Sequence, residues 1–358
     1  MRIVVTGAEG FIGKNLCVRL GEVGCCEVVA ITRATPSESV EKALTVADFV
    51  FHLAGANRPD KEAEFTRDNT DLTRSLCLLL ASTGRRIPVV FASSIQAENN
   101  SPYGASKRRA EEVLVEYGNS TESGVYLFRL PNVFGKWSRP NHNSAVATFC
   151  YNLSQGLPIT VNDPTARLRL VHIDDVVEAF IGLLPRPGSV PHAGGMRQIE
   201  PVYDSTVGAV ADILRGIAEG RRAARIPDTG HGLVRALYST YISFLQPEDF
   251  KYPVERHVDS RGAFVEFLRT PGAGQISYFT AGPGITRGGH YHHTKTEKFL
   301  VVQGTARFRF RDLASAATYE IVTGAGASEV IDTSPGWVHD VTNIGLDELI
   351  VLVWANER

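Results

Sequence analysis

Long apolar runs are missing from the 358-residue sequence, and none approaches the roughly 20 residues that a membrane-spanning helix needs. A strong charge of either sign is missing too. The 37 lysines and arginines offset 39 aspartates and glutamates, which leaves a formal net charge of −2. A chain so close to neutrality gives no indication of a nucleic-acid partner or an anionic membrane surface. We therefore expect neither nucleic-acid binding nor membrane attachment.

Cysteine is scarce and confined to the first half of the chain. The five cysteines are Cys17, Cys25, Cys26, Cys77 and Cys150. Their spacing matches neither a disulfide framework nor a zinc-binding framework. Most have apolar neighbours, so we expect buried free thiols in a reducing compartment. The sequence also begins directly with a predicted strand and leaves no room for a secretion signal, so we expect a cytoplasmic protein.

Two different patterns divide the chain. Up to about residue 246, apolar strand-like runs alternate with helical patterns, which is typical of a doubly wound parallel α/β sheet of the Rossmann type. After the proline-bounded polar stretch 246–253, short strands follow one another between glycines and prolines, which is typical of an all-β sandwich or barrel. The strands predicted there are 264–268, 274–279, 298–302, 306–311, 318–322 and 349–354. We predict two domains, 1–246 and 247–358.

A glycine-rich turn follows the first predicted strand, 2–6, and precedes a predicted helix. In this context the spacing of Gly7, Gly10 and Gly13 predicts a dinucleotide phosphate site, because glycines allow the pyrophosphate to approach and the helix N-terminus supplies N–H donors. The cofactor contacts expected in this turn are Gly7, Gly10, Phe11, Ile12 and Gly13.

The end of the second predicted strand, 27–31, suggests which nicotinamide cofactor binds. A carboxylate there usually contacts the ribose 2′-hydroxyl of NAD, but this chain has Arg33 instead. A guanidinium suits a 2′-phosphate, so we expect NADPH; the alternative is an ordinary surface arginine. The small residues that end the next strand, in the run Leu53, Ala54 and Gly55, would let the cofactor lie close to the backbone.

A hydroxyl and a tyrosine–lysine pair supply candidate catalytic groups. Ser94 ends the predicted strand 89–92, and a helix capped by Ser101 follows with Tyr103 and Lys107 four residues apart on one face. An adjacent ammonium lowers the pKa of a phenol, which would make Tyr103 a better proton donor at neutral pH. With the glycine turn, these residues resemble the short-chain dehydrogenase/reductase superfamily, and that resemblance assigns catalysis to Ser94, Tyr103 and Lys107.

Two further segments resemble the extended, nucleotide-sugar branch of that superfamily. The run 128–135 contains Asn132, which the resemblance places at the substrate diphosphate, and the run 170–177 contains His172. Relatives often carry a phosphate-binding arginine four residues before the histidine, where this chain has Leu168. We assign that role to Arg169, with Arg167 as the alternative. Relatives that eliminate water carry an Asp-Glu pair directly after the serine. This chain has 95–96 as Ile-Gln, which favours plain reduction or oxidation.

Histidines and a glutamate cluster in the second predicted domain. His290 and His292 alternate, so in a strand both would point to one face, and Glu297 opens the next apolar run. His339 adds a fourth candidate ligand from another strand. These donors suit zinc first and manganese, iron or nickel after it; the alternative is a polar hairpin with surface histidines. The spacing around these four residues resembles both signature motifs of the cupin superfamily, which implies a small barrel with a metal in its mouth.

The order of the two halves resembles a family of bifunctional capsule and O-antigen enzymes in which an extended reductase is fused to a zinc cupin. The resemblance implies C3 epimerisation of a UDP-2-acetamido-2,6-dideoxy-4-hexulose by the cupin. NADPH-dependent reduction of the C4 ketone then follows, giving the L-talose product en route to UDP-N-acetyl-L-fucosamine. It also implies a homodimer or higher homo-oligomer. The epimerase base stays open among Tyr291, His293, Lys295, Lys298 and Asp340.

Two rival hypotheses remain at this point. In one, the reductase is active and the zinc cupin only stabilises the barrel or a dimer. In the other, the chain is a non-catalytic nucleotide sensor, which the complete set of Ser94, Tyr103 and Lys107 argues against.

Overall fold

The structure is a computed structural model that describes residues 1–24, 26–59, 61–185, 194–223, 225–254, 257–259, 262–264, 268 and 275–356. Cys25, residues 265–267 of the predicted strand 264–268, and Gly274 lie outside the described residues. The chain forms two compact units, of which the first comprises residues 1–133 and 169–202 and the second residues 134–168 and 203–358. Among the described residues, no helix is both long and apolar enough to cross a membrane.

The first unit is built on a six-stranded sheet in the order β2-β1-β3-β4-β5-β8, whose strands all pair in parallel. The strands are β1 (Arg2–Thr6), β2 (Glu27–Ile31), β3 (Phe49–His52), β4 (Val89–Ser94), β5 (Val125–Leu130) and β8 (Gly195–Arg197). The β1, β3 and β4 residues are buried on both faces, as expected of a parallel sheet covered by helices. The predicted α/β class is confirmed.

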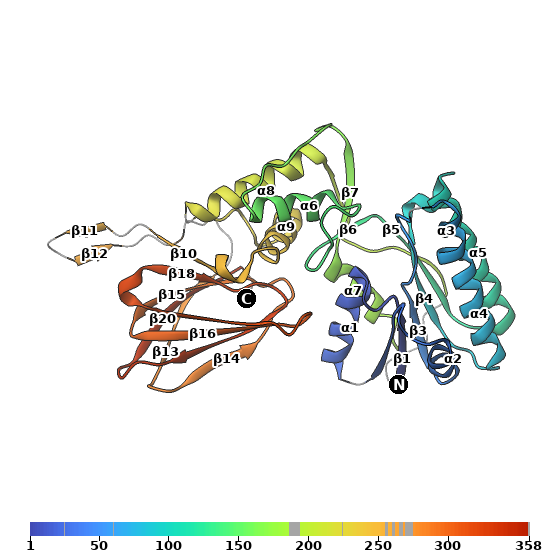
Figure 1. The fold of residues 1–358 in the computed structure, drawn as a ribbon, viewed down its shortest axis with the longest axis horizontal. Coiled ribbons are helices and arrows are strands. Elements are labelled where there is room, and N and C mark those ends of the chain that lie inside the picture. Colours follow the sequence, from blue (N-terminus) through green and yellow to red (C-terminus); the bar gives the residue numbers. More distant parts are fainter. Residues whose placement is uncertain are drawn as a thin grey trace. The chain divides into compact units, whose positions relative to one another are not determined.

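Helices cover both faces of this sheet (Figure 1). Helices α1 (Phe11–Val23) and α7 (Ile173–Ile181) pack on one face, in a cluster that includes Ile3, Val5 and Phe128. On the other face, a second cluster includes Val4, Val50 and Phe91. The helices there are α2 (Ser37–Thr45), α4 (Leu72–Ser82) and α5 (Pro102–Thr121). Alternate residues of one strand therefore serve two cores, as the period of a strand requires.

Several short elements complete the connections. They are α3 (Ala63–Phe65), the π-helical turn η1 (Thr66–Asp71), the 3₁₀ turn η2 (Ile95–Glu98), β6 (Asn132–Phe134), β7 (Arg167–His172) and β9 (Tyr203–Thr206). Because β1, β3 and β4 are parallel, their carboxyl ends meet at one edge of the sheet, where ligands bind in such folds.

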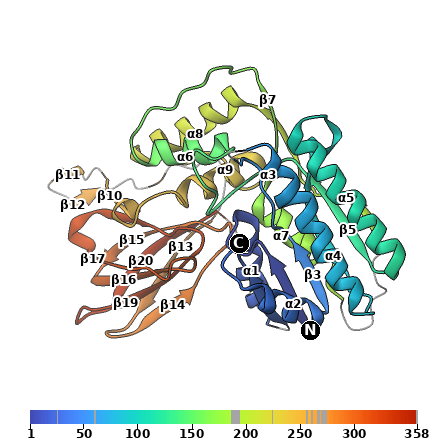
Figure 2. The same cartoon turned by 45° about the vertical axis from the view of Figure 1, so that its right-hand side comes forward.

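The second unit joins three helices to an all-β barrel. Helix α6 (Ala145–Ser154) packs against α8 (Val207–Arg222) and α9 (Gly232–Ile242) (Figure 2). One barrel sheet has the order β10-β18-β15-β20-β13 and the other β14-β19-β16-β17, and all their pairs are antiparallel. Phe299 from the first sheet packs against Phe308 from the second, so one apolar core joins them.

The barrel strands agree with most of the predicted positions. The five-stranded sheet contains β10 (Lys251–Pro253), β13 (Gln275–Ala281), β15 (Glu297–Gln303), β18 (Glu329–Asp332) and β20 (Leu349–Ala355). The other contains β14 (Thr286–His290), β16 (Thr305–Asp312), β17 (Thr318–Gly324) and β19 (Trp337–Asn343), and β11 (His257–Asp259) pairs with β12 (Gly262–Phe264). The turns η3 (Pro247–Phe250) and η4 (Ala325–Ala327) complete the unit. The predicted all-β second half is confirmed.

Candidate active site and metal centre

The turn after β1 can approach a ligand because its glycines leave no room for side chains. Gly7 has a φ of 69°, and a Cβ there would lie 2.7 Å from the backbone nitrogen of Ala54. A Cβ at Gly13 would lie 2.2 Å from the carbonyl oxygen of Gly7. Gly10 is the N-cap of α1 and offers no side-chain acceptor, so the first-turn N–H groups, which begin at Phe11 and Ile12, can bind a phosphate. The turn fits the pyrophosphate of a dinucleotide.

The segment Leu53–Gly55 lies beside this turn and beside the catalytic helix. A Cβ at Gly55 would lie 2.5 Å from Asn69 Oδ1 and 3.5 Å from Lys107 Nζ. Asn69 holds the segment in place, because it accepts from the Ala56 N–H and donates to the Ala56 carbonyl, each at 2.9 Å. Asn69 could not be singled out from the sequence, because it lies in a polar helical run that carries no distinguishing motif.

Arg33 lies exposed in the turn after β2, on the same edge of the sheet. Its charge contributes to a lowered pKa at Asp68, where hydrogen bonding from Arg67 is the main cause. Arg33 therefore lies outside the core, after β2, and close enough to Asp68 for its charge to act there.

The structure brings Ser94, Tyr103 and Lys107 together. Ser94 is buried at the end of β4 and lies close enough to the Tyr103 hydroxyl to act on its pKa. Lys107 is 7% exposed, and its Nζ donates to the Ala92 carbonyl oxygen at 2.9 Å. Burial lowers the pKa of Lys107 to about 8, although Glu111 opposes the shift. A buried amine so close to the strand end can donate to a ribose hydroxyl or to the phenol.

One electrostatic prediction for this site is wrong in the structure. The sequence predicts that Lys107 lowers the pKa of Tyr103, but burial raises that pKa, and the nearby Ser94 opposes the rise. The physical reason is the direction of the ammonium, which donates to the Ala92 carbonyl rather than to the phenol.

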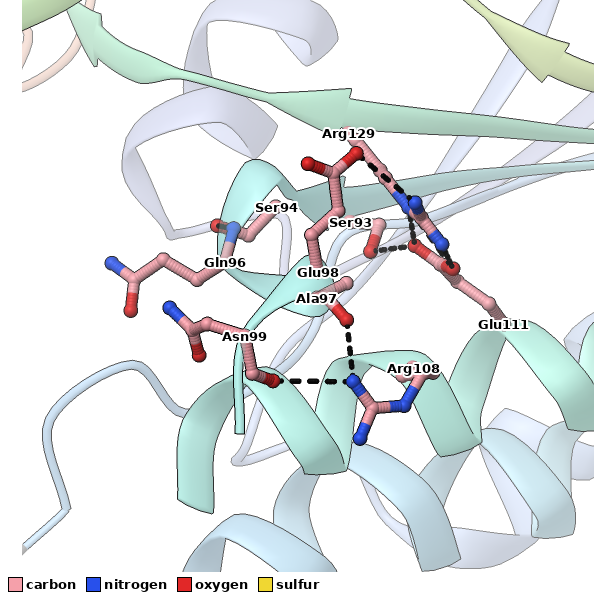
Figure 3. A network of polar contacts seen from close by, with 9 residues as sticks. All are labelled: Ser93, Ser94, Gln96, Ala97, Glu98, Asn99, Arg108, Glu111 and Arg129. Carbon is pink, nitrogen blue, oxygen red and sulfur yellow. Dashed lines mark hydrogen bonds and ion pairs between the residues drawn. The ribbon is translucent and has the colours of Figure 1, made fainter. Parts of the chain in front are cut away.

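A polar network joins the end of β4, next to Ser94, to helix α5 and strand β5 (Figure 3). Glu111, 5% exposed, accepts from Ser93 Oγ at 2.5 Å and from Arg129 Nη2 at 2.7 Å. Arg129 also contacts Glu98 in the turn after Ser94. Arg108 donates to the carbonyl oxygens of Ala97 and Asn99 and so holds that turn to α5. This network was missed from the sequence, although Glu111 lies one further helical turn beyond Lys107 and the spacing could have shown it.

The residues predicted to bind substrate lie on β6, β7 and the start of α7. Asn132 is exposed, and its Nδ2 donates to the Arg169 carbonyl oxygen at 3.2 Å. Arg167 and Arg169 are both exposed and alternate along β7, so they share a strand face opposite Leu168. His172 is 4% exposed at the N-cap of α7, with Nδ1 3.8 Å from Asp174. The structure thus places Asn132 beside Arg169 and keeps His172 inside.

In the second unit, the four predicted metal ligands meet. One ligand atom from each of His290, His292, Glu297 and His339 lies within 4.8 Å of the others. The rings of His290 and His339 are 5.0 Å apart, and those of His292 and His339 are 5.6 Å apart. They come from β14, β15, β19 and the segment after β14. His290 is exposed whereas Glu297 and His339 are buried, so the cluster opens to solvent on the His290 side.

The donor atoms fit a cation. Glu297 Oε2 lies 3.1 Å from His339 Nε2 and 3.4 Å from His292 Nε2. Yet Glu297 Oε2 and His292 Nε2 are buried without a partner in hydrogen-bond geometry among the described residues. Burial would raise the pKa of Glu297, but His292 and His339 outweigh it and the pKa is lowered. An ionised carboxylate among imidazoles that point inward is a borderline-metal site, for which zinc is the common occupant.

The regular alternation predicted for His290 and His292 is wrong in one respect. Strand β14 ends at His290, and His292 lies in the following non-strand segment. Gly288 and Gly289 have φ values of 98° and 77°, and the pairing register shifts between Gly288 and His290. This irregularity bends the chain, so that a loop residue rather than a strand residue completes the cluster.

Hydrogen bonds from Thr333 and Asn356 to backbone groups hold the ligand segments together. Thr333 Oγ1 accepts from the Glu297 N–H at 3.0 Å, and the Thr333 N–H donates to the Glu297 carbonyl at 2.9 Å. Asn356, 3% exposed, accepts from the Thr296 N–H at 2.8 Å and donates to the Thr294 carbonyl at 3.3 Å. Neither supporting residue carried a sequence motif, because each acts through backbone groups of a distant segment.

The structure narrows the candidate epimerase bases. Lys298 alternates with Glu297 along β15 and is buried against Asp332 at 2.6 Å, so it faces away from the metal cluster. Asp340 alternates with His339 and pairs with Arg309. Tyr291 and His293 contact each other, with ring centroids 5.6 Å apart. Lys295 Nζ lies 3.4 Å from Glu297 Oε1, which brings Lys295 to the ligand set.

Two family models match the chain. The model of the NAD dependent epimerase/dehydratase family matches residues 3–196, and the model of the polysaccharide biosynthesis C-terminal domain matches residues 257–358. The two matched segments follow the order of the predicted reductase and cupin halves.

Two relatives match the whole chain, and a third matches part of it. A UDP-2-acetamido-2,6-beta-L-arabino-hexul-4-ose reductase from Pseudomonas aeruginosa is 51% identical over 357 residues, covering 100% of this chain and 95% of the relative. The crystal structure of the capsular polysaccharide assembling protein CapF from Staphylococcus aureus is 37% identical, with a TM-score of 0.70 and coverage of 100% and 96%. A UDP-glucuronic acid 4-epimerase from Bacillus cereus, 19% identical with a TM-score of 0.54, covers 61% of this chain and 83% of its own, and shares the fold.

Proposed function

Since the chain belongs to the NAD dependent epimerase/dehydratase family, we propose that it reduces the C4 ketone of a UDP-2-acetamido-2,6-dideoxy-4-hexulose with NADPH. The observation that carries the proposal is that Ser94 lies close to the Tyr103 hydroxyl, with buried Lys107 beside Gly55. The Pseudomonas aeruginosa reductase, similar along the whole chain, acts on a substrate of this class. Exposed Arg33 supports NADPH rather than NADH, since a guanidinium matches a 2′-phosphate.

The reductase residues divide the work between orientation and proton transfer. Ser94 holds the ketone oxygen beside the Tyr103 hydroxyl, which donates the proton to that oxygen. Lys107 binds the cofactor ribose and, once turned from the Ala92 carbonyl, favours the ionised phenol left behind. The nicotinamide, when bound, supplies the hydride to C4. Asn132 and Arg169 lie together at β6 and β7, and we assign them to the nucleotide diphosphate together with His172 at the end of β7.

We further propose that the metal centre epimerises C3 before the reduction. The C4 carbonyl acidifies the neighbouring C3–H bond, and a divalent metal held by His290, His292, Glu297 and His339 would stabilise negative charge that develops on the carbonyl oxygen. The exposed side at His290 supports access by a substrate. Lys295, in contact with Glu297, is the residue we assign to proton transfer at C3. Zinc is the metal we expect from this donor set.

The test separates the two steps in one sample. Proton NMR of the UDP-4-keto-sugar in D₂O follows loss of the C3 proton signal without NADPH and formation of the reduced sugar with it. We expect His290→Ala to abolish exchange but to reduce pre-epimerised substrate normally, and Tyr103→Phe to exchange normally but to leave NADPH unoxidised.

Each half of the proposal can fail separately in this experiment. Unchanged exchange in His290→Ala would mean that the metal is only structural and that the cupin does not epimerise. Full NADPH turnover in Tyr103→Phe would remove the reductase assignment. We expect the active species to be a cytoplasmic homodimer or higher homo-oligomer, which light scattering of the purified chain will measure.

A further inference from the structure

The turn formed by Ser334, Pro335 and Gly336 lies between two segments that carry metal ligands, the loop with His292 and the strand with His339. The Gly336 N–H donates to the carbonyl oxygen of His292 at 3.1 Å, and the Trp337 N–H closes the turn on the Ser334 carbonyl at 3.1 Å. Strand β19 starts at the next residue and carries His339. A displacement of this turn therefore moves a ligand on each side of it.

The indole of Trp137 lies directly against this turn. A Cβ added to Gly336 would be 2.7 Å from Cζ2, 3.2 Å from Cε2 and 3.4 Å from Nε1 of Trp137. Trp137 belongs to the loop between β6 and α6, about 200 residues earlier in the chain but in the same compact unit. Gly336 also has a φ of 83°, so the position requires glycine for its conformation and for the closeness of the indole.

The loop holds Trp137 in an uncommon conformation. Its φ is 67°, which costs free energy for an aromatic residue and persists only when the surroundings enforce it. The Ser138 hydroxyl and N–H both donate to the Gly135 carbonyl, at 2.7 and 3.3 Å, and so fix the turn around Trp137. The buried Lys136 places its Nζ 5.5 Å from the centroid of the indole. These contacts hold Trp137 in the conformation in which its indole lies against Gly336.

We propose that Trp137 is a positioning residue for the metal centre, acting through Gly336 on His292 and His339. Trp137 lies in the loop between β6, which carries Asn132, and helix α6. A loop from the predicted reductase half of the sequence therefore sets the geometry of the metal ligands. The inference rests on the proposed function only for its catalytic consequence. Its direct consequence is metal affinity, which is measurable without any substrate.

The first experiment measures zinc affinity by competition with a chromophoric chelator. Trp137→Ala removes the indole from Gly336, and we expect affinity to fall about 10-fold, at the low end of the 10–100-fold losses found when groups that orient metal ligands are removed. Trp137→Phe keeps an aromatic ring in the same place and is expected to keep most of the affinity. Near-UV circular dichroism of the zinc-free variants checks that each is folded.

A double-mutant cycle tests the contact itself. Gly336→Ala is expected to weaken zinc binding more in the wild-type background than in Trp137→Ala, because the clash with the indole is then gone. Gly284→Ala is the matched control. Gly284 has a similar φ of 76°, but a Cβ there meets nothing within 4 Å, so it reports backbone strain without the contact.

The proposal is overturned if Trp137→Ala binds zinc as tightly as the wild type, or if the effects of Trp137→Ala and Gly336→Ala simply multiply. Failure of the epimerase hypothesis gives a different pattern: zinc affinity follows the cycle as described, yet C3 deuterium exchange is absent even in the wild type. With both correct, exchange at limiting zinc falls in Trp137→Ala, whereas reduction of pre-epimerised substrate does not.

Discussion

His52 shows how a single buried residue can be fixed in one protonation state. Its Nδ1 lies 2.8 Å from Thr6 Oγ1 and its Nε2 lies 2.9 Å from Thr73 Oγ1. Thr73 donates its only proton to the Asn69 carbonyl, so it accepts from Nε2–H, and Nδ1 accepts from Thr6. Burial, helped by Lys107, lowers the pKa of His52 to about 3. A neutral imidazole is therefore built into the end of β3, beside the cofactor segment.

We predict that His52 makes the zinc-free protein lose stability in acid. The unfolded chain binds a proton below pH 6.5 and the folded chain only below about 3, so stability is full above 6.5 and falls as the pH drops toward 3. At pH 5 the loss is about 2 kcal/mol, taking 1.36 kcal/mol per unit over the 1.5 units below 6.5. Urea unfolding of His52→Gln, which can keep both hydrogen bonds, should show a flatter decline between pH 7.5 and 5. Parallel curves for the two proteins would contradict this.

At the scale of single residues, the sequence predicts the residues whose type and spacing indicate a chemical role. It misses the buried residues whose role is to hydrogen-bond groups that are distant in the sequence. Histidines and a glutamate in a glycine-bounded run can be recognised as ligands from their residue types and spacing alone. His52, Asn69 and Asn356 cannot, because their roles arise from backbone groups and hydroxyls that are distant in sequence. The direction of Lys107 is likewise a product of packing, which explains the wrong expectation for the Tyr103 pKa.

Helix α5 is the element that organises the reductase site. Tyr103, Lys107 and Glu111 follow at intervals of four residues and share one face. Gly104 lets that helix press against η2, since a Cβ there would lie 2.1 Å from the Gln96 carbonyl oxygen. The Ser101 hydroxyl accepts from the Gly104 N–H at 3.0 Å, which confirms the predicted N-cap. The N-cap of the helix, its close contact with η2 and its catalytic side chains therefore all lie in or just before its first three turns.

We predict that Glu111→Gln moves the alkaline limit of ketone reduction to lower pH. Glu111 raises the pKa of Lys107 against the effect of burial, so its removal lowers that pKa further below about 8 and deprotonates the amine earlier. We expect the limb of the kcat/KM profile to shift by up to about 1 unit, measured on pre-epimerised substrate. Glu112→Gln, the exposed neighbour, is the matched control.

A further variant, Ser93→Ala, tests whether a change in Glu111→Gln comes from a folding defect. Glu111→Gln leaves Arg129, whose side chain is 29% exposed, with Glu98 as its carboxylate partner, so the variant loses the half-buried ion pair with Glu111 and some stability. Ser93→Ala removes only the hydrogen bond to Glu111 and keeps the ion pair, so it is expected to fold and to shift the limb less. An unshifted profile in both variants would show that Glu111 supports Lys107 by packing alone.

The regular elements of the chain follow from the periodicity of its sequence, and the irregular ones do not. The continuous apolar runs of β15 and β20 and the alternating apolar residues of β16 predict those strands closely. Strand β14 is not among the strands predicted from apolar periodicity, because its residues are polar and glycine-rich, and its register shift occurs at positive-φ glycines. Strand β18 is four residues long and too short for a period to be seen.

At the scale of the whole molecule, linear order and compact units differ. The sequence places a domain boundary at 246, which remains a prediction for how the two halves are delimited. In the structure, helices α6, α8 and α9 belong to the same compact unit as the barrel. Arg221 of α8 pairs with Asp332 at 2.8 Å, and Asp332 also pairs with the fully buried Lys298 at 2.6 Å. Only the fold reveals this, because the partners are separated by up to 111 residues.

Helix α9 packs against the barrel, so removing the barrel would expose buried residues of this helix. Its residues Ala236–Ile242 are all buried, and a helix buried on every side needs neighbours on every side. Helices α6 and α8 cover one side. On the barrel side, Ser334 Oγ donates to the Ile242 carbonyl, Arg235 donates to Thr294, and Tyr238 lies near Lys298 and Asp332.

We therefore predict that a chain ending at residue 246 aggregates and is not an independent reductase. The truncation exposes the barrel-facing side of α9, including Tyr238 and Tyr241, and leaves Arg221 without Asp332. Sedimentation and binding of a hydrophobic dye measure this exposure. Full-length His290→Ala is the control, because it disrupts the metal centre but keeps the barrel, and it should stay monodisperse and reduce pre-epimerised substrate. A soluble, dye-free and active 1–246 chain would mean that α9 needs no barrel, and that the two catalytic halves fold as separately as their order in the sequence suggests.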